Sequence, residues 1–352
     1  MTKVLKISSQ DELIASIPHT LGFTPRGMVC LAFGGGPTAR LDIPESPEEL
    51  GEFLQALSDV YLHQHHPRRV ALVAYGEDGP GCVQALAALA EALVSGEGRG
   101  PDVGPMLWVN GEEWTDVLEG SRGTVDFGAR ARMDAEFALL GRVMPVDRRE
   151  DLAAAMQGDP TAVAQLLQAA EARVLDMDVA ACRTEVEWLG ERLDQFGRDR
   201  EYLSDSDATR VLAVMHDSGA RDAAETRMRR EHAPISSEFW GDLVRRAPSE
   251  VRDTPAAMLA LSSYLEGKGA QAWVAIDQLT ASHPLADLVT IALEQAIDPR
   301  DLERAFRPDP PGTLMQQAAL RDTIAHQRRH DYDAHTGSGV DGAGPESSAT
   351  GR

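Results

Sequence analysis

One stretch of the chain, residues 69–82, constrains the fold more than any other. It reads Arg-Val-Ala-Leu-Val-Ala-Tyr-Gly-Glu-Asp-Gly-Pro-Gly-Cys and continues into a long alanine-rich segment. A short β-branched apolar run between arginines and a glycine is typical of a strand that is buried on both faces. The alanine-rich segment after the glycines favours a helix. Strand, glycine turn and helix in this order predict an α/β sheet.

The turn of this unit is the first candidate for a ligand site, because open α/β sheets bind ligands beyond the carboxyl ends of their strands. The candidate ligand-binding residues are Gly76, Glu77, Asp78 and Gly81. A phosphate loop needs free backbone amides and usually a cation, whereas Glu77 and Asp78 would repel an anion. A tight strand-to-helix connection with two solvated acids is therefore the favoured interpretation, and a small-molecule site is the alternative.

Further strands are predicted on both sides of this unit. They lie at residues 27–33, 39–43, 105–109 and 114–117. The first two are separated by a glycine-rich segment and the last two by Asn110-Gly111, and both patterns indicate β-hairpins. We therefore expect an N-terminal α/β domain over residues 1–145, with a small mixed sheet and helices.

From about Val125 onward the apolar residues recur at helical spacing, and no further strand is predicted. In the segment 161–175, one helical face is expected to carry Val163, Leu166, Leu167, Ala170 and Val174. We expect an all-α domain at residues 146–330. The composition after Arg329 changes to Gly, Ser, Asp, Ala and Thr, which predicts a disordered tail at residues 331–352.

Residues 254–286 are predicted to form a helical hairpin like one tetratricopeptide repeat. Ala260 and Ala272 stand where such helices need small side chains, and Gly267-Lys268-Gly269 supplies the turn. A repeat of this kind cannot bury its own apolar face, so neighbouring helices must stack on it. The candidate partner-binding residues on this face are Ala257, Leu261 and Tyr264. The alternative is that all three belong to the core.

Charge and cysteine usage exclude several classes of function. The chain has 56 acidic residues against 34 Lys and Arg, a net charge of −22, which opposes binding to nucleic acids and to anionic membranes. Its three cysteines form no Cys-x-x-Cys pair, which favours a reducing compartment. No apolar run approaches the ~20 residues of a membrane span. We expect a soluble cytoplasmic protein with no nucleic-acid or membrane partner.

Candidate metal and catalytic groups are few. His63, His65 and His66 are ligand types for zinc, yet they precede a proline at a predicted helix end, where imidazoles also serve as caps. Asp217 and Arg221 share a helical face, so a salt bridge is favoured over catalysis. No serine lies in a nucleophile elbow, and no zinc-protease motif occurs. We predict no metal, no cofactor and no catalytic residue.

Several segments resemble, in the right order, an actinobacterial family known as domain of unknown function 4192. They are Asp11 to Ala15 with Leu21-Gly22-Phe23-x-Pro25, Arg40-x-Asp42-x-Pro44, Asp217 with Arg221-Asp222, Leu259 to Ala270 with Tyr264 and Gly267, and His283-Pro284. The resemblance covers most of residues 10–306. Residues 115–126 depart from it, because they lack the paired cysteines that many members carry there. The resemblance implies no known activity, substrate or catalytic residue.

These observations favour a protein-binding, adaptor or regulatory module rather than an enzyme. The partner would be a protein, and neither its identity nor the oligomeric state follows from the sequence. The alternative is an enzyme or a small-molecule-binding protein that uses the strand-end cleft near Gly76–Gly81. An enzyme should bring several titratable groups with displaced pKa values together in that cleft.

Overall fold

The structure is a computed structural model that describes residues 6–33, 38–44, 46, 49–51, 54, 65–95, 100–140 and 144–305. The predicted tail at 331–352, His63 and the glycine-rich segment after residue 33 lie outside the described residues. The described residues up to Glu303 belong to one compact unit. The domain boundary at about residue 145 stays a prediction.

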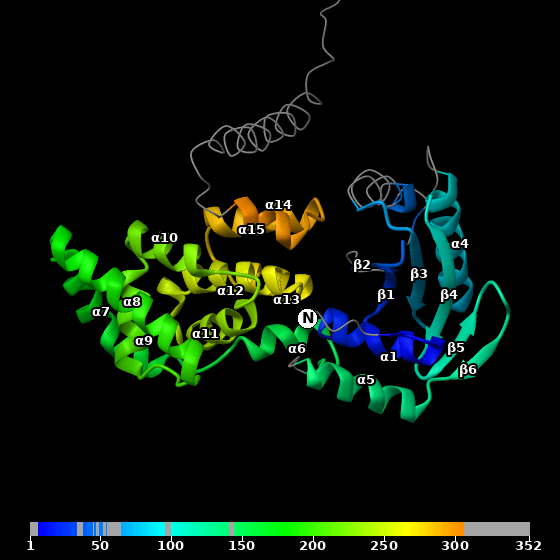
Figure 1. The fold of residues 1–352 in the computed structure, drawn as a ribbon, viewed down its shortest axis with the longest axis horizontal. Helices are drawn as coiled ribbons and strands as arrows, with labels where there is room; N and C mark the ends of the chain where they lie inside the picture. Colours follow the sequence, from blue (N-terminus) through cyan, green and yellow to red (C-terminus); the bar gives the residue numbers. More distant parts are fainter. Residues whose placement is uncertain are drawn as a thin grey trace, which may run out of the picture. The chain divides into compact units, whose positions relative to one another are not determined.

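A mixed sheet of six strands forms the N-terminal part, as predicted (Figure 1). The strands are β1 (Gly27–Ala32), β2 (Thr38–Leu41), β3 (Arg69–Tyr75), β4 (Asp102–Asn110), β5 (Glu113–Asp116) and β6 (Arg122–Thr124). Their order is β2-β1-β3-β4-β5-β6; β3 and β4 are parallel, and the other neighbours are antiparallel. The strands of both predicted hairpins pair antiparallel, as expected. Strand β6 was not predicted, because three residues are too few to show an alternating pattern.

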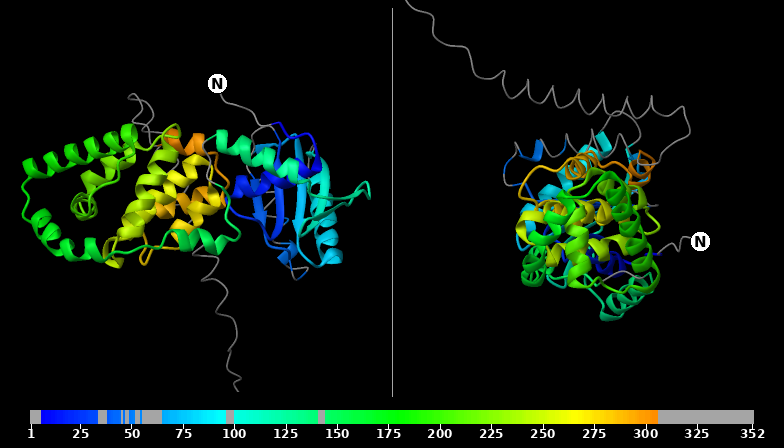
Figure 2. Two further views of the ribbon diagram at one scale, coloured as in Figure 1. Left: turned by 90° about the horizontal axis from the view of Figure 1, so that it is seen from below. Right: turned by 90° about the vertical axis from the view of Figure 1, so that its left-hand side faces the viewer.

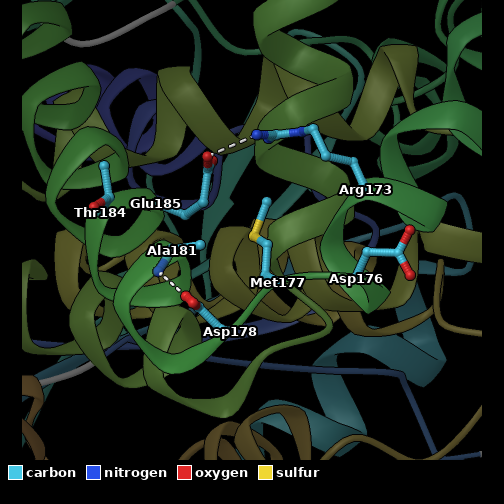
Figure 3. Close-up of a pocket in the computed structure, with 7 residues that line it drawn as sticks. All are labelled: Arg173, Asp176, Met177, Asp178, Ala181, Thr184 and Glu185. Carbon is cyan, nitrogen blue, oxygen red and sulfur yellow. Dashed lines mark hydrogen bonds and ion pairs between the residues drawn. The ribbon is translucent and has the colours of Figure 1, made fainter.

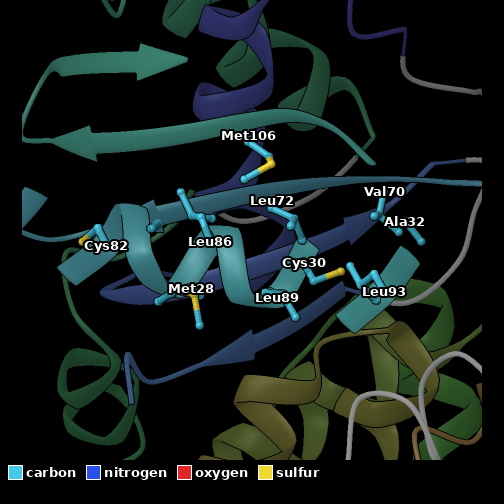
Figure 4. Close-up of a cluster of buried hydrophobic side chains, with 12 residues drawn as sticks. Met28, Cys30, Ala32, Val70, Leu72, Cys82, Leu86, Leu89, Leu93 and Met106 are labelled. Atoms are coloured by element: carbon cyan, nitrogen blue, oxygen red, sulfur yellow. The ribbon is translucent and has the colours of Figure 1, made fainter. Parts of the chain in front are cut away.

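Strand β3 is the centre of the sheet, and its alternating side chains divide the core into two layers. Residues 70–74 are all fully buried. Val70, Leu72 and Ala74 pack against helix α4 (Gly79–Ser95), together with Cys30 and Met106 of the neighbouring strands (Figure 4). The intervening Ala71 and Val73 face the cluster of helix α1 (Gln10–Leu21) on the other side. This period of two is the consequence of the pleat.

Helix α1 is itself covered by helix α5 (Phe127–Leu139). The contact combines a small apolar cluster of Ala15, Met133 and Phe137 with two polar pairs. His19 Nε2 lies 2.7 Å from Asp134 Oδ1, and Arg132 pairs with the buried Glu12. The imidazole also stacks on the Phe137 ring, with centroids 4.5 Å apart.

All regular structure after β6 in the described residues is helical, as predicted. The helices are α6 (Arg149–Ala155), α7 (Thr161–Leu175), α8 (Val179–Asp199), α9 (Asp205–Val214), α10 (Ser218–Arg227), α11 (Ala233–Arg246), α12 (Asp253–Glu266), α13 (Gly269–Ile276), α14 (Pro284–Glu294) and α15 (Pro299–Ala305), with a short 3-10 turn at Ser249–Val251. Among the helices that the structure describes, none combines the length and the apolar composition of a membrane-spanning segment.

Helix α12 is the core of this helical region. Every residue from Pro255 to Leu265 is buried, because α11, α13 and α14 all pack against it (Figure 1 and Figure 2, where α12 is yellow). Gly267 ends the helix in the left-handed conformation, at φ 85°, and α13 follows directly. The predicted hairpin is therefore present at its predicted turn, although its second helix ends at Ile276. Its likeness to a tetratricopeptide repeat stays a prediction.

Candidate functional site

Asp78 holds the turn between β3 and α4 together through two hydrogen bonds. Asp78 Oδ1 accepts a hydrogen bond from the Gly81 amide at 3.2 Å, and the Asp78 carbonyl accepts one from Cys82 N at 3.0 Å. The Asp78 carboxylate thus occupies the amino end of α4, where a phosphate would otherwise bind. Glu77 and Asp78 are both exposed, as the interpretation of a tight connection with solvated acids requires.

Trp108 of β4 fills the space beside this turn. Its indole Nε1 donates a hydrogen bond to the Gly76 carbonyl at 2.9 Å. A Cβ atom on Gly79 would lie 2.6 Å from the Trp108 ring, and one on Gly81 would lie 2.2 Å from Asp78 Oδ2. Gly79 and Gly81 are therefore explained by the close approach of Trp108 and Asp78. A ligand at Gly76, Glu77, Asp78 and Gly81 stays a prediction.

Two further titratable groups lie near this end of β3. Burial raises the pKa of Tyr75, and its hydroxyl has no hydrogen-bond partner among the described residues. Burial, followed by the charge of Asp78, raises the pKa of the Cys82 thiol. The two groups stay neutral at physiological pH and belong to opposite core layers of the sheet. They do not form a common site.

The candidate partner-binding residues on α12 lie in the core. Ala257 and Leu261 are fully buried, and Tyr264 is 5% exposed. The Tyr264 hydroxyl donates a hydrogen bond to the Ile297 carbonyl, beyond the end of α14. Their burial favours the core alternative, because a partner could reach these side chains only if the surrounding helices moved apart.

The expected salt bridge between Asp217 and Arg221 is replaced by two helix caps. Asp217 Oδ1 accepts a hydrogen bond from Ala220 N at 3.0 Å and so begins α10. The Arg221 guanidinium donates to the carbonyls of Met215 and His216, at 2.8 and 2.9 Å, at the end of α9. The carbonyls at a helix end have no partner within the helix and carry partial negative charge, so a guanidinium is a suitable donor to them. Within the described residues, no His, Cys, Asp and Glu side chains form a group that could hold a metal.

His283 caps helix α14 through its Nδ1 atom, which accepts from Leu285 N at 3.3 Å. Burial, followed by the charge of Arg221, lowers the pKa of His283, although Asp253 and Asp287 oppose this shift. The cap requires a neutral ring, so its contribution is complete above the unfolded pKa of ~6.5 and is lost as the pH falls below that value. We expect the His283→Asn variant, which keeps a cap that does not titrate, to lose up to ~1 kcal/mol less stability than wild type between pH 7.5 and 5.

Urea unfolding of both proteins at the two pH values measures this difference. All other side chains are common to both proteins, so the comparison isolates residue 283. An identical loss of stability in wild type and variant would show that the His283 cap is not sensitive to pH.

A pocket of about 640 Å³ lies where helices α7 and α8 meet, and it was not among the sites predicted from the sequence (Figure 3). It is lined by Arg173, Asp176, Met177, Asp178, Ala181, Thr184 and Glu185. Asp178 Oδ1 accepts from Ala181 N at 2.8 Å and so begins α8. A volume of this size lies in the usual range for binding sites.

Glu185 fixes the geometry of this pocket. Its buried carboxylate accepts hydrogen bonds from Arg173 Nη1 of α7 at 2.8 Å, and from Arg210 Nε and Nη2 of α9 at 2.8 and 2.9 Å. Burial alone would raise the pKa of Glu185, but the hydrogen bonds from Arg210 and Arg173 outweigh it and lower the pKa to about 2. The Arg210 guanidinium also lies 3.7 Å from the centroid of the Trp188 ring. One carboxylate thus connects three helices.

Two apolar residues that neighbour pocket-lining residues in the chain are exposed. Leu175, the last residue of α7, is 86% exposed, and Val179, the first residue of α8, is 79% exposed. Met177 lies between them in the chain and lines the pocket. Leu175, Met177 and Val179 thus stand at alternate positions across the turn and the helix ends beside it. This pattern is a sequence signal for a surface contact, because a turn between helices is normally polar.

Comparison with known proteins places most of the described unit in one family. A family model described as a domain of unknown function (DUF4192) matches residues 11–300, which include the sheet and nearly all of the helical region. Searches among curated proteins and among solved structures found no match. The matched span contains all the segments on which the resemblance in the sequence rests. The chain therefore belongs to the family of the domain of unknown function DUF4192.

Proposed function

We propose that the protein is a protein-binding module and that its binding surface is the turn between α7 and α8. The observation that carries this proposal is the exposure of Leu175 and Val179, which precede and follow the pocket-lining residues Asp176, Met177 and Asp178 in the chain. Exposed apolar side chains that are grouped around a concavity are typical of interaction sites, whereas single exposed ones need no explanation. Burial of each side chain by a partner would contribute about 1.5–3 kcal/mol.

The surface is also held in shape before a partner arrives. Hydrogen bonds from α7 and α9 meet at Glu185 on α8, so the first turns of α8 and the last turns of α7 are tied to α9. A preformed surface loses little conformational entropy on binding, which favours affinity. An adaptor or regulatory role would follow from the identity of the bound protein.

The alternative, an enzyme or a small-molecule-binding protein at Gly76–Gly81, has less support. Trp108 and Asp78 use the carbonyl of Gly76 and the amide of Gly81 that a ligand would need. A thermal-shift screen with nucleotides and metabolites tests this alternative. A clear stabilisation that the Asp78→Ala substitution changes would favour it.

We expect the double substitution Leu175→Ser and Val179→Ser to reduce capture of a specific partner from native lysate at least tenfold. The loss of two apolar contacts of about 1.5–3 kcal/mol each is sufficient for this effect. Quantitative mass spectrometry of the captured proteins measures it. Both side chains are exposed, so the free energy of unfolding should change by less than ~0.5 kcal/mol.

The matched control is Leu139→Ser, because Leu139 of α5 is equally apolar and is 75% exposed. A partner that binds wild type and the double variant equally would show that Leu175 and Val179 do not belong to its binding surface. If wild type captures no protein above the background of an unrelated acidic protein, the proposed module itself is wrong.

A further inference from the structure

The opening of the α7–α8 pocket is negatively charged. Its lining contains one guanidinium and three carboxylates. Arg173 is directed to Glu185 at 2.8 Å, and Figure 3 shows this pair on the side of the pocket away from Asp178. No basic side chain of the described residues pairs with Asp176 or Asp178. Asp178 is stabilised at the amino end of α8, which it caps, whereas Asp176 has no such compensation among the described residues.

The position of Asp176 is unfavourable for the stability of its own helix. Asp176 is the C-cap residue of α7, where the helix dipole places partial negative charge. A cation is preferred at such a position, and α7 offers only Arg173 in its last turn, which is already paired with Glu185. A residue that breaks a local rule without compensation inside the protein is expected at a functional position. An incoming cation would compensate both the carboxylate and the helix end.

We infer that the pocket receives a lysine or arginine side chain of the partner protein, and that apolar side chains next to this cation pack on Leu175 and Val179. The inference rests on the proposed binding function and defines the chemistry of the partner. The cation meets Asp176, Asp178 and the carboxyl end of α7. The exposed Leu175 and Val179 exclude water around this ion pair, which strengthens it. A free metal ion would leave both apolar side chains without a contact.

Selection of random twelve-residue peptides on phage against the full chain tests the inference. We expect the enriched peptides to carry Lys or Arg beside a large apolar residue. Fluorescence anisotropy with one synthetic enriched peptide should then show at least tenfold weaker binding to the Asp176→Asn, Asp178→Asn double variant. Binding should also weaken in 0.5 M NaCl, because salt screens the ion pair.

The two aspartate substitutions are expected to preserve the fold, and their effect on stability provides a control for their effect on binding. Asparagine at position 178 still caps α8, and Asp176→Asn should raise the melting temperature slightly while it weakens binding. A residue with a merely structural role would not change the two properties in opposite directions. Asp194→Asn removes an exposed carboxylate elsewhere on α8 and should leave binding unchanged.

The outcomes separate this inference from the proposed function. One outcome would overturn the inference and leave the binding surface in place. In that outcome, the enriched peptides lack basic residues, bind the Asp176→Asn and Asp176→Asn, Asp178→Asn variants normally, and fail to bind the Leu175→Ser, Val179→Ser variant. Peptides that bind all these variants normally would overturn both. An empty selection would also count against both.

Discussion

Replacement of Tyr264 by alanine should lower the free energy of unfolding by about 3–5 kcal/mol, the usual cost of removing a buried aromatic ring. Tyr264 is 5% exposed on α12, and its hydroxyl donates a hydrogen bond to the Ile297 carbonyl. The substitution therefore leaves a cavity between α12 and the segment after α14, and it also removes the donor to the Ile297 carbonyl. Urea unfolding followed by circular dichroism measures the loss.

The matched variant Tyr264→Phe separates the two contributions. It keeps the ring and removes only the hydrogen bond, so its cost should be about 1 kcal/mol. If Tyr264→Ala loses less than ~1 kcal/mol but no longer binds a partner, Tyr264 lines a groove and the core assignment is wrong.

Replacement of Glu185 by glutamine should cost about 3 kcal/mol at pH 7. The substitution removes the carboxylate that pairs with the Arg173 and Arg210 guanidinium groups. Glu185 is buried but both arginines are partly exposed, so the cost is expected at the lower end of the about 3–5 kcal/mol for breaking a buried pair from one side. Glutamine has nearly the same shape, so the effect reports the charge rather than a cavity. Glu187→Gln, at an exposed position of the same helix, is the control and should change stability by less than ~0.5 kcal/mol.

The pH dependence gives this prediction a second test. The pKa of Glu185 is about 2 in the folded state against 4.5 as the ordinary value. A lowered pKa means that the carboxylate stabilises the fold above pH ~4.5 and loses this contribution as the pH falls toward 2. The difference between wild type and Glu185→Gln should therefore decrease by more than half by about pH 3. A difference that stays constant from pH 7 to 3 would show that the ion cluster does not contribute through charge.

The sequence alone was sufficient for the elements whose signals are local. The β-branched run at residues 70–74, the glycines after it and the alanine-rich segment predict β3, the turn and α4, because strand and helix propensities act over neighbouring residues. The segment 161–175 forms α7 as predicted, and Val163 and Leu167 on its apolar face are buried. Leu166, expected on the same face, is 43% exposed, because α9 covers only part of that face.

The tertiary structure decided what each element contacts, and this is where the functional expectations changed. Trp108 lies far from the glycine turn in the chain, so no local pattern reveals that its ring excludes a side chain at Gly79. The residues around Tyr264 in the sequence show the same amphipathic pattern whether its helix face lines a groove or lies in the core. The face is buried because three neighbouring helices pack against α12. The charge partners of Glu185 come from α7 and α9. Local propensity determines helices and strands, but burial and charge pairing depend on residues that only the folded chain brings together.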